Sequence, residues 1–508
     1  MRNQRKFGVI LSYVAMLINI MIGICYTPII IRLLGKSEFG LFSLATSVIT
    51  FLAILDFGFG NALVRFNAKY IAINDKTGES KIHGFFFLLY LLIGIVSVIV
   101  GYHISNNVDL LFSNTFRVTE LNKLKIILLI MTVNVALSFP LSIYSSILTA
   151  YERFAFLKIA GIISTILTNS VILVSLYFSY QSVAMAFISA IFSIGTKFFI
   201  MLYCYSKIRV RFSFTNYDPL VIKEILIYSF FIFVEIIVDQ LYTNTDKIII
   251  GAVIGPNEVA IYTIAMMFLT YFIQFSTAIN SVFLPKITRM TTLDQNMNAL
   301  SDLFIRVGRL QFIVLIFILS GFILYGKDFI MFWAGESYAG AYYMALIVMI
   351  PRIISLSQNL GIVILQAQNK LKFRVIIYLI IAIFNVAISI PLAKEYGGVG
   401  AAIGTLIATI LGQILTMNWY YYKKVKLNIP LYWKEILSIT AVAIPILTIG
   451  YILNIIIPSD KISLLAVKIG LFSIIFLLIG FKYIFNQYEK NLLLSVFDKF
   501  KKMVEVRI

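Results

Sequence analysis

Long apolar segments separated by short polar stretches recur along the whole of this 508-residue chain. A helix needs about 20 consecutive apolar residues to cross the hydrocarbon core of a bilayer. Each segment is about that long, and charged residues, Gly or Pro bound it. We therefore predict fourteen membrane-spanning helices, at about residues 8–33, 39–62, 84–104, 124–149, 157–179, 182–206, 226–253, 257–284, 307–326, 341–365, 373–393, 397–420, 435–456 and 463–482.

The composition agrees with an all-α integral membrane protein. Hydrophobic residues make up 60% of the chain and charged residues 13%, whereas a soluble domain has about 45–50% and about 25%. The polar stretches between the predicted helices are too short to hold a soluble catalytic domain. Because Gly35-Lys36-Ser37 lacks the upstream glycine of a phosphate-binding loop, we expect no nucleotide as a partner.

Residue types that hold metals are scarce. The chain has two cysteines, Cys25 and Cys204, and two histidines, His83 and His103. These four residues cannot form a disulfide framework, a thiolate cluster or a credible imidazole metal site. We expect no metal and no organic cofactor.

The basic residues are distributed unevenly between the predicted loops. If the N-terminus is cytoplasmic, thirty of the 42 Lys and Arg residues fall in inward-facing segments and nine in outward-facing ones; the other three lie within predicted helices. This bias follows the positive-inside rule, so we predict that both termini are cytoplasmic. The net charge of +19 is then explained by an anionic membrane leaflet and does not indicate nucleic acid.

The chain resembles itself at a shift of about 220 residues. At a shift of 220, residues 34–45 contain three identities, namely Gly35 with Gly255, Glu38 with Glu258 and Ala45 with Ala265. At a shift of 216, further identities include Asn169 with Asn385, Tyr180 with Tyr396, Val183 with Val399 and Ala186 with Ala402. Chance similarity between Leu- and Ile-rich helices is the alternative explanation.

The repeat predicts the domain organisation. We expect two six-helix lobes in parallel repeat, at residues 1–210 and 220–425, because an even number of helices returns the chain to the same side. Two additional transmembrane helices follow within 430–482, and a cytoplasmic amphipathic tail at 483–508. Parallel repeats of this kind are a transporter architecture.

Short motifs in both halves resemble a known family. They are Pro28-Ile29-Ile30-Ile31-Arg32-Leu33-Leu34-Gly35, Glu38-Phe39-Gly40-Leu41-Phe42, Leu55-Asp56-Phe57-Gly58-Phe59-Gly60, Val64-Arg65-Phe66, Asp246-Lys247-Ile248-Ile249-Ile250-Gly251 and Glu258-Val259-Ala260-Ile261-Tyr262. These motifs resemble those of bacterial oligosaccharide flippases, the polysaccharide-transporter branch of the multidrug/oligosaccharidyl-lipid/polysaccharide exporter superfamily. Ala260 stands where we expect glycine.

The resemblance implies a fold and a function. The fold is V-shaped and two-lobed, like that of the multidrug exporters (MATE). The function is that of a flippase, not an enzyme, which moves undecaprenyl-pyrophosphate-linked oligosaccharide, such as an O-antigen or capsular repeat unit, from the cytoplasmic to the outer leaflet by alternating access. The implied partners are this glycan, the bilayer of a bacterial cell membrane and a polysaccharide polymerase complex.

Ionisable residues inside apolar helices are costly, so they are candidates for function. At 100° per residue, Glu235, Asp239 and Asp246 share one stripe of the helix predicted at 226–253, and we consider them candidates for coupling to H⁺ or Na⁺. The candidates for binding the pyrophosphate headgroup are the cations Arg32, Arg65, Lys197, Lys247 and Arg352. The alternative is that these acids and bases neutralise one another in structural pairs.

Two other functions remain open. A cation-coupled multidrug exporter would use the same fold, although the first predicted helix lacks the acidic residue that such exporters usually have there. An integral membrane glycosyltransferase or polymerase would need acidic residues on a large outer loop. The longest outer loop, at 105–123, offers Asp109 and Glu120 without an Asp-x-Asp motif.

Overall fold

The computed structural model describes residues 2–215, 217–293, 297–368, 370–458 and 461–491, and within these ranges it contains helices and no strand. The predicted all-α fold is therefore confirmed. Contacts divide the chain into two compact units. Unit 1 comprises Met1–Ile264 and Tyr378–Thr405, and unit 2 comprises Ala265–Ile377 and Leu406–Ile508. The lobe boundaries inferred from the repeat stay a prediction.

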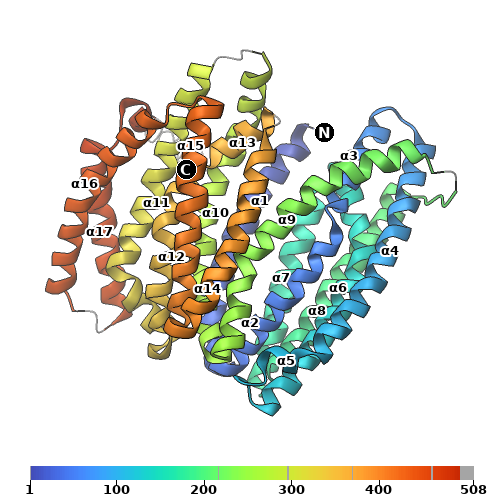
Figure 1. The fold of residues 1–508 in the computed structure, drawn as a ribbon, viewed down its shortest axis with the longest axis horizontal. Coiled ribbons are helices and arrows are strands. Elements are labelled where there is room, and N and C mark those ends of the chain that lie inside the picture. The colour runs from blue at the N-terminus through green and yellow to red at the C-terminus, as the bar shows by residue number, and fades with distance from the viewer. Residues whose placement is uncertain (1, 216, 294–296, 369, 459–460, 492–508) are drawn as a thin grey trace, which may run out of the picture. The chain divides into compact units, whose positions relative to one another are not determined.

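Unit 1 is built around three long helices, α4, α6 and α8, which run side by side in Figure 1. The side chains of Phe86, Tyr90 and Phe139 belong to its buried aromatic core. Its helices are α1 (Arg2–Leu34), α2 (Lys36–Thr50), α3 (Phe59–Ala72), α4 (Lys76–Asn106), α5 (Val108–Phe112), α6 (Val118–Ala150), α7 (Phe154–Tyr177), α8 (Ser182–Tyr203), α9 (Pro219–Val253), the start of α10 (Pro256–Leu293) and most of α14 (Leu371–Ala408).

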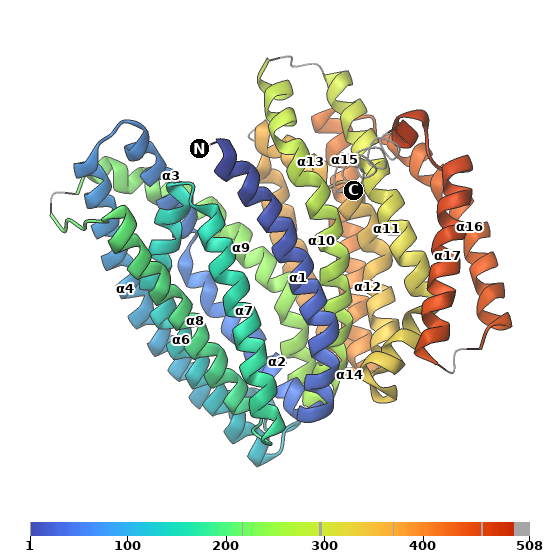
Figure 2. The same cartoon turned by 180° about the vertical axis from the view of Figure 1, so that it is seen from behind.

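Unit 2 contains the remainder of the helices. In Figure 2, α16 and α17 lie next to each other beside α11, and both pack against it. The helices that lie wholly in this unit are α11 (Met297–Ala334), α12 (Gly340–Ser357), α13 (Asn359–Ala367), α15 (Met417–Tyr420), α16 (Ile429–Ile456) and α17 (Ile462–Tyr483).

Twelve candidate spans within the described ranges are long and apolar enough to cross a membrane, so the chain is a multi-pass membrane protein. The predicted count of fourteen is not confirmed, and two differences account for it. Helix α9 is not among the twelve, and its sequence carries Glu235, Asp239, Asp246 and Lys247. The segment Leu371–Val425 is counted once, although it covers the two helices predicted at 373–393 and 397–420.

Helix α14 folds back on itself between those two predicted helices. Gly397 has φ 66° and ψ −145°, a conformation that interrupts the helix and that a residue with a Cβ rarely adopts. The two segments then pack closely, because a Cβ on Gly400 would lie 1.9 Å from the carbonyl oxygen of Leu392. The helical hairpin is therefore set by glycines at its turn and at its contact surface.

The helix predicted at 39–62 is broken in its second half. Helix α2 continues into a 3₁₀ turn, Phe51–Asp56, and α3 begins after Phe57 (φ 51°) and Gly58 (φ 75°). Tyr90 Oη of α4 donates a hydrogen bond to Asp56 Oδ1 (2.6 Å). Asp56 thus stands at a helix end.

Each half of the sequence repeat makes an equivalent contact inside unit 1. Glu38, at the start of α2, accepts a hydrogen bond from the backbone N–H of Ser182 at the start of α8 (3.4 Å). Glu258, at the start of α10, accepts one from the backbone N–H of Gly398 (3.3 Å), directly after the turn in α14. The two pairs follow the shifts of 220 and 216 residues, which supports the alignment of the halves.

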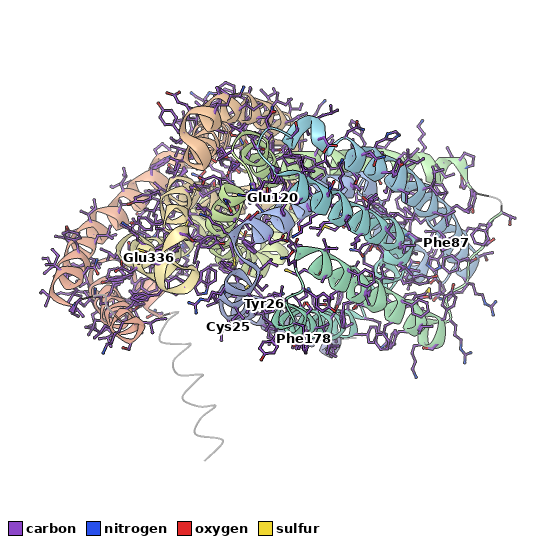
Figure 3. The ribbon with its side chains drawn as sticks, turned by 90° about the horizontal axis from the view of Figure 1, so that it is seen from below. Cys25, Tyr26, Phe87, Glu120, Phe178 and Glu336 are labelled. Carbon is purple, nitrogen blue, oxygen red and sulfur yellow. The ribbon has the colours of Figure 1, made fainter. Side chains whose placement is uncertain are left out.

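Polar contacts hold further helix ends of unit 1 around Glu38. Lys123 of α6 forms a salt bridge with Glu38. Glu120, labelled in Figure 3 near the start of α6, accepts a hydrogen bond from Ser37 Oγ (2.5 Å) and another from the backbone N–H of Arg117 (2.9 Å). These interactions fix the starts of α2, α6 and α8 relative to one another.

A buried ion-pair network ties the end of unit 2 to its core. The guanidinium of Arg309 in α11 forms salt bridges with Glu435 of α16 and, over 3.0 Å, with Glu489. Glu489 and Asn486 exchange backbone-to-side-chain hydrogen bonds of 2.8 and 2.9 Å, and a helix begins at Gln487. The first residues of the predicted amphipathic tail are thus anchored, whereas 492–508 lie outside the described residues.

Candidate functional site

Asp246 is a buried carboxylate in the last third of α9, where it is 3% exposed. Tyr262 Oη of α10 donates a hydrogen bond to Asp246 Oδ2 (2.5 Å), and Thr405 Oγ1 of α14 donates a second to the same oxygen (2.7 Å). The other oxygen, Oδ1, is buried and makes no hydrogen bond with the described residues. It is therefore the atom at which a proton or a cation would be stabilised.

Uncharged polar side chains extend this site along α14. Asn385 Nδ2 donates to Thr405 Oγ1 (3.5 Å), and Ser389 Oγ donates to Asn385 Oδ1 (3.1 Å). The close approach of Ser389 requires Gly404, since a Cβ there would lie 2.2 Å from Ser389 Oγ. We refer to the buried residues Asp246, Tyr262, Asn385, Ser389 and Thr405 as the Asp246 cluster.

The Asp246 cluster offers oxygen atoms and one amide group. Such ligands suit a proton or a hard cation, whereas transition metals prefer imidazole and thiolate ligands. The described ranges hold no group of three or more His, Cys, Asp or Glu residues that could hold a metal ion. The chemistry of the cluster is therefore that of one carboxylate among neutral donors.

The other two acids of the predicted stripe lie in a different environment. Helix α9 is continuous from Pro219 to Val253, so Glu235, Asp239 and Asp246 do lie along one helix face. Glu235 and Asp239 are exposed, whereas Asp246 is enclosed by α10 and α14. The structure thus separates Asp246 from the other two acids by burial.

Four of the five candidate headgroup-binding cations belong to unit 1. Arg32 and Arg65 are exposed, and the guanidinium of Arg65 lies 4.6 Å from the centroid of the Tyr228 ring of α9. Lys197 of α8 and Lys247 of α9 are partly buried, and neither forms a salt bridge with a residue in the described part of the chain.

The fifth cation, Arg352, belongs to α12 of unit 2. Its Nη1 donates a hydrogen bond to Gln413 Oε1, in the π-helical turn Thr409–Thr416. The amide oxygen of Gln413 accepts this hydrogen bond and thereby orients the guanidinium.

A model of the family described as polysaccharide biosynthesis protein matches residues 6–291, which is more than half of the chain. This chain belongs to the polysaccharide biosynthesis protein family. The resemblance inferred from the sequence motifs is thereby confirmed. Asp246 and Tyr262 lie within the matched residues, whereas Arg352, Asn385 and Thr405 lie beyond their end.

A curated relative of this family member is the probable flippase AglR of Haloferax volcanii. The two sequences are 26% identical over 180 residues, which cover 35% of this chain and 37% of AglR. The chain therefore aligns with little more than a third of the length of this relative.

Solved structures of two transporters share the fold of the polysaccharide biosynthesis protein. The lipid II flippase MurJ, in an inward closed conformation, has a TM-score of 0.73 at 18% identity, covering 94% of this chain and 98% of MurJ. An inward-facing multidrug resistance transporter of the MATE family, in the MOP superfamily, has a TM-score of 0.64 at 14% identity, covering 83% of this chain and 96% of that one. The predicted MATE-like fold is therefore confirmed.

Sequence reasoning found one of the five residues of the Asp246 cluster in this family member. It missed the other four as site residues because they are uncharged, and an uncharged polar residue in an apolar helix is common. One signal was present, since Asn385 and Ser389 lie four residues apart and so share a helix face. Tyr262 and Thr405 contact Asp246 only because α10 and α14 pack against α9.

Proposed function

We propose that this protein is a flippase that moves undecaprenyl-pyrophosphate-linked oligosaccharide from the cytoplasmic to the outer leaflet by alternating access. The observation that carries this proposal is the family match over residues 6–291, which joins the chain to polysaccharide biosynthesis. The function serves the assembly of cell-surface polysaccharide in a bacterial cell membrane, with both termini in the cytoplasm. A polysaccharide polymerase complex is the proposed downstream partner.

The task explains why cations are kept inside such a fold. A pyrophosphate headgroup carries negative charge and must cross about 30 Å of hydrocarbon, where an unpaired charge is costly. Arginine offers bidentate hydrogen bonds to phosphate oxygens, and lysine offers a compact positive charge. We assign headgroup binding to Arg32, Arg65, Lys197, Lys247 and Arg352.

We propose ion coupling at the Asp246 cluster. Asp246 Oδ1 is buried without a hydrogen-bond partner among the described residues, so protonation or binding of Na⁺ there would relieve an unfavourable state. A change of charge at this point would alter the packing of α9 against α10 and α14. Glu235 and Asp239, being exposed, are the proposed relay between the cluster and water.

An enzymatic role is disfavoured by the contacts of the acids near the longest predicted outer loop. Asp109 forms a salt bridge with Lys125 (2.5 Å). Glu120 accepts hydrogen bonds from Ser37 Oγ and from the backbone N–H of Arg117 at the start of its own helix. Both carboxylates thus have structural partners, and a transport function is the simpler proposal.

The decisive experiment is a leaflet-resolved flipping assay in liposomes. The protein is reconstituted with fluorescently labelled undecaprenyl-pyrophosphate oligosaccharide, and the label exposed on each side is measured over time. The wild type is expected to accelerate flipping, and the double variant Lys247→Ala/Arg352→Ala to slow it at least tenfold, because each charge-assisted hydrogen bond contributes about 1.5–3 kcal/mol. Lys394→Ala/Lys461→Ala, in which two exposed lysines are removed, is the charge-matched control.

Two results would contradict the proposal. Unchanged flipping by the Lys247/Arg352 double variant would remove the headgroup assignment. Absence of flipping by the wild type, together with gradient-driven export of a cationic dye from the same liposomes, would instead favour a multidrug exporter.

A further inference from the structure

A polar pocket that includes no residue of the Asp246 cluster lies in unit 2. It has a volume of about 390 Å³ and lies between the start of α11 and the turn that leads into α16. Its lining includes Asn298, Ser301, Lys423, Lys426 and Asn428. Nothing in the proposed transport of the glycan uses these residues.

The pocket is equipped to bind an anion. Two ammonium groups, two side-chain amides and a hydroxyl can donate hydrogen bonds, and the described lining contains no acidic side chain. Lys423 and Lys426 are exposed, so their charges are available to a ligand. A phosphate group matches this donor set in charge and in number of acceptors.

The backbone around the pocket holds Lys426 in place. Lys426 has φ 61°, a left-handed conformation that is unusual for a residue with a long side chain. The next residues are fixed by hydrogen bonds from Leu427 N to Tyr421 O (3.0 Å) and from Asn428 N to Ser301 Oγ (2.7 Å). The turn therefore has a defined structure, and its hydrogen bond to Ser301 holds the start of α16 against α11.

The surroundings place the pocket at a membrane interface. Tyr422 lines it and is 48% exposed, and Trp419, one helical turn earlier, is 51% exposed. Exposed Tyr and Trp side chains are typical of the headgroup level of a bilayer. The segment 421–434 carries four lysines and no acid, which the positive-inside rule assigns to the cytoplasmic face.

We propose that this pocket binds the phosphate of an anionic glycerophospholipid from the cytoplasmic leaflet. The lipid headgroup would bridge Lys423 and Lys426 to the start of α11, while its acyl chains stay in the bilayer. Basic pockets at helix ends on this side of a membrane bind anionic lipid in the same way. The site is a structural or regulatory lipid site and is independent of which glycan is carried.

The test measures lipid binding by the full-length protein purified in a neutral detergent. The apparent unfolding midpoint is followed while dioleoyl-phosphatidylglycerol is added, and native mass spectrometry counts the bound lipids. Phosphatidylglycerol is expected to raise the midpoint, whereas phosphatidylcholine is not. In Lys423→Gln/Lys426→Gln the half-saturating concentration is expected to rise about thirtyfold and one bound phosphatidylglycerol to be lost.

Matched variants and soluble anions make the result specific. Lys394→Gln/Lys461→Gln removes the same charge elsewhere and should keep the wild-type response, and Lys423→Arg/Lys426→Arg should retain binding. Wild-type binding by the Gln double variant would overturn the proposal. So would an equal shift with phosphatidylcholine, or an equal shift with inorganic phosphate or pyrophosphate, which would indicate a soluble anion as the ligand.

Discussion

Gly40 of α2 lies directly against the carbonyl oxygen of Pro256, the first residue of α10: a Cβ at position 40 would lie 1.8 Å from that oxygen. Both residues are at the start of the second helix of their sequence half. Glycine is thus required here by close approach of the backbone and not by its φ angle.

Gly40→Ala is expected to destabilise unit 1. The new methyl group would force α2 and α10 apart, at a cost of about 1–3 kcal/mol. Gly161→Ala in α7 is the control, because nothing lies within 4 Å of its Cβ position and alanine favours a helix by about 0.5–1 kcal/mol. Unfolding midpoints in mild detergent compare the two; a Gly40→Ala protein as stable as the wild type would contradict the observed contact.

Glu258→Ala is expected to weaken the hairpin of α14. It removes the acceptor for the backbone N–H of Gly398, at a cost of about 1 kcal/mol, as for the loss of a helix cap. Glu258→Gln keeps an acceptor oxygen and should retain most of the stability. Glu395→Ala, at an exposed position of α14, removes the same charge and should be neutral. Equal unfolding midpoints for all three variants would show that the cap contributes nothing.

Arg309→Met is expected to release the end of unit 2. Glu489 is 2% exposed, so loss of its partner leaves a buried carboxylate unpaired, at a cost of about 3–5 kcal/mol. Lys125→Met breaks the pair with Asp109, in which the two side chains are 30% and 48% exposed, and should cost less than about 1 kcal/mol. Hydrogen exchange should rise at residues 487–491 in the Arg309 variant alone, and unchanged protection there would refute the anchor.

Asp246→Asn is expected to uncouple flipping from an ion gradient. Asparagine keeps the size of the side chain but removes its charge, so an imposed H⁺ or Na⁺ gradient should accelerate flipping about tenfold less than in the wild type, within the range of usual coupling energies. The Lys394→Ala/Lys461→Ala protein should respond as the wild type does. The same liposome assay measures this response, and an unaltered gradient dependence would exclude Asp246 as the coupling residue. An unchanged unfolding midpoint shows that the variant is folded.

The class of fold follows from the order of apolar and polar residues alone, because hydropathy acts segment by segment. Apolar runs of bilayer length specify helices wherever they occur in the chain, whereas the break after Asp56, within the helix predicted at 39–62, became evident only in the structure. The shifts of 220 and 216 residues also align the two equivalent contacts that Glu38 and Glu258 make. The number of spans does not follow from hydropathy alone. Helix α9 carries several charges and is not among the candidate spans, and the segment that turns at Gly397 is counted as one span.

Which ionisable residues are enclosed depends on how helices that are distant in sequence pack together. Helical periodicity places Glu235, Asp239 and Asp246 on one stripe, but burial depends on what packs against each position. Tyr262 and Thr405 reach Asp246 from 16 and 159 residues away, and no local pattern encodes such a meeting. The positions of charged residues are evident from the sequence. The hydrogen-bond partners of each buried charge depend instead on the packing of helices that are distant in sequence.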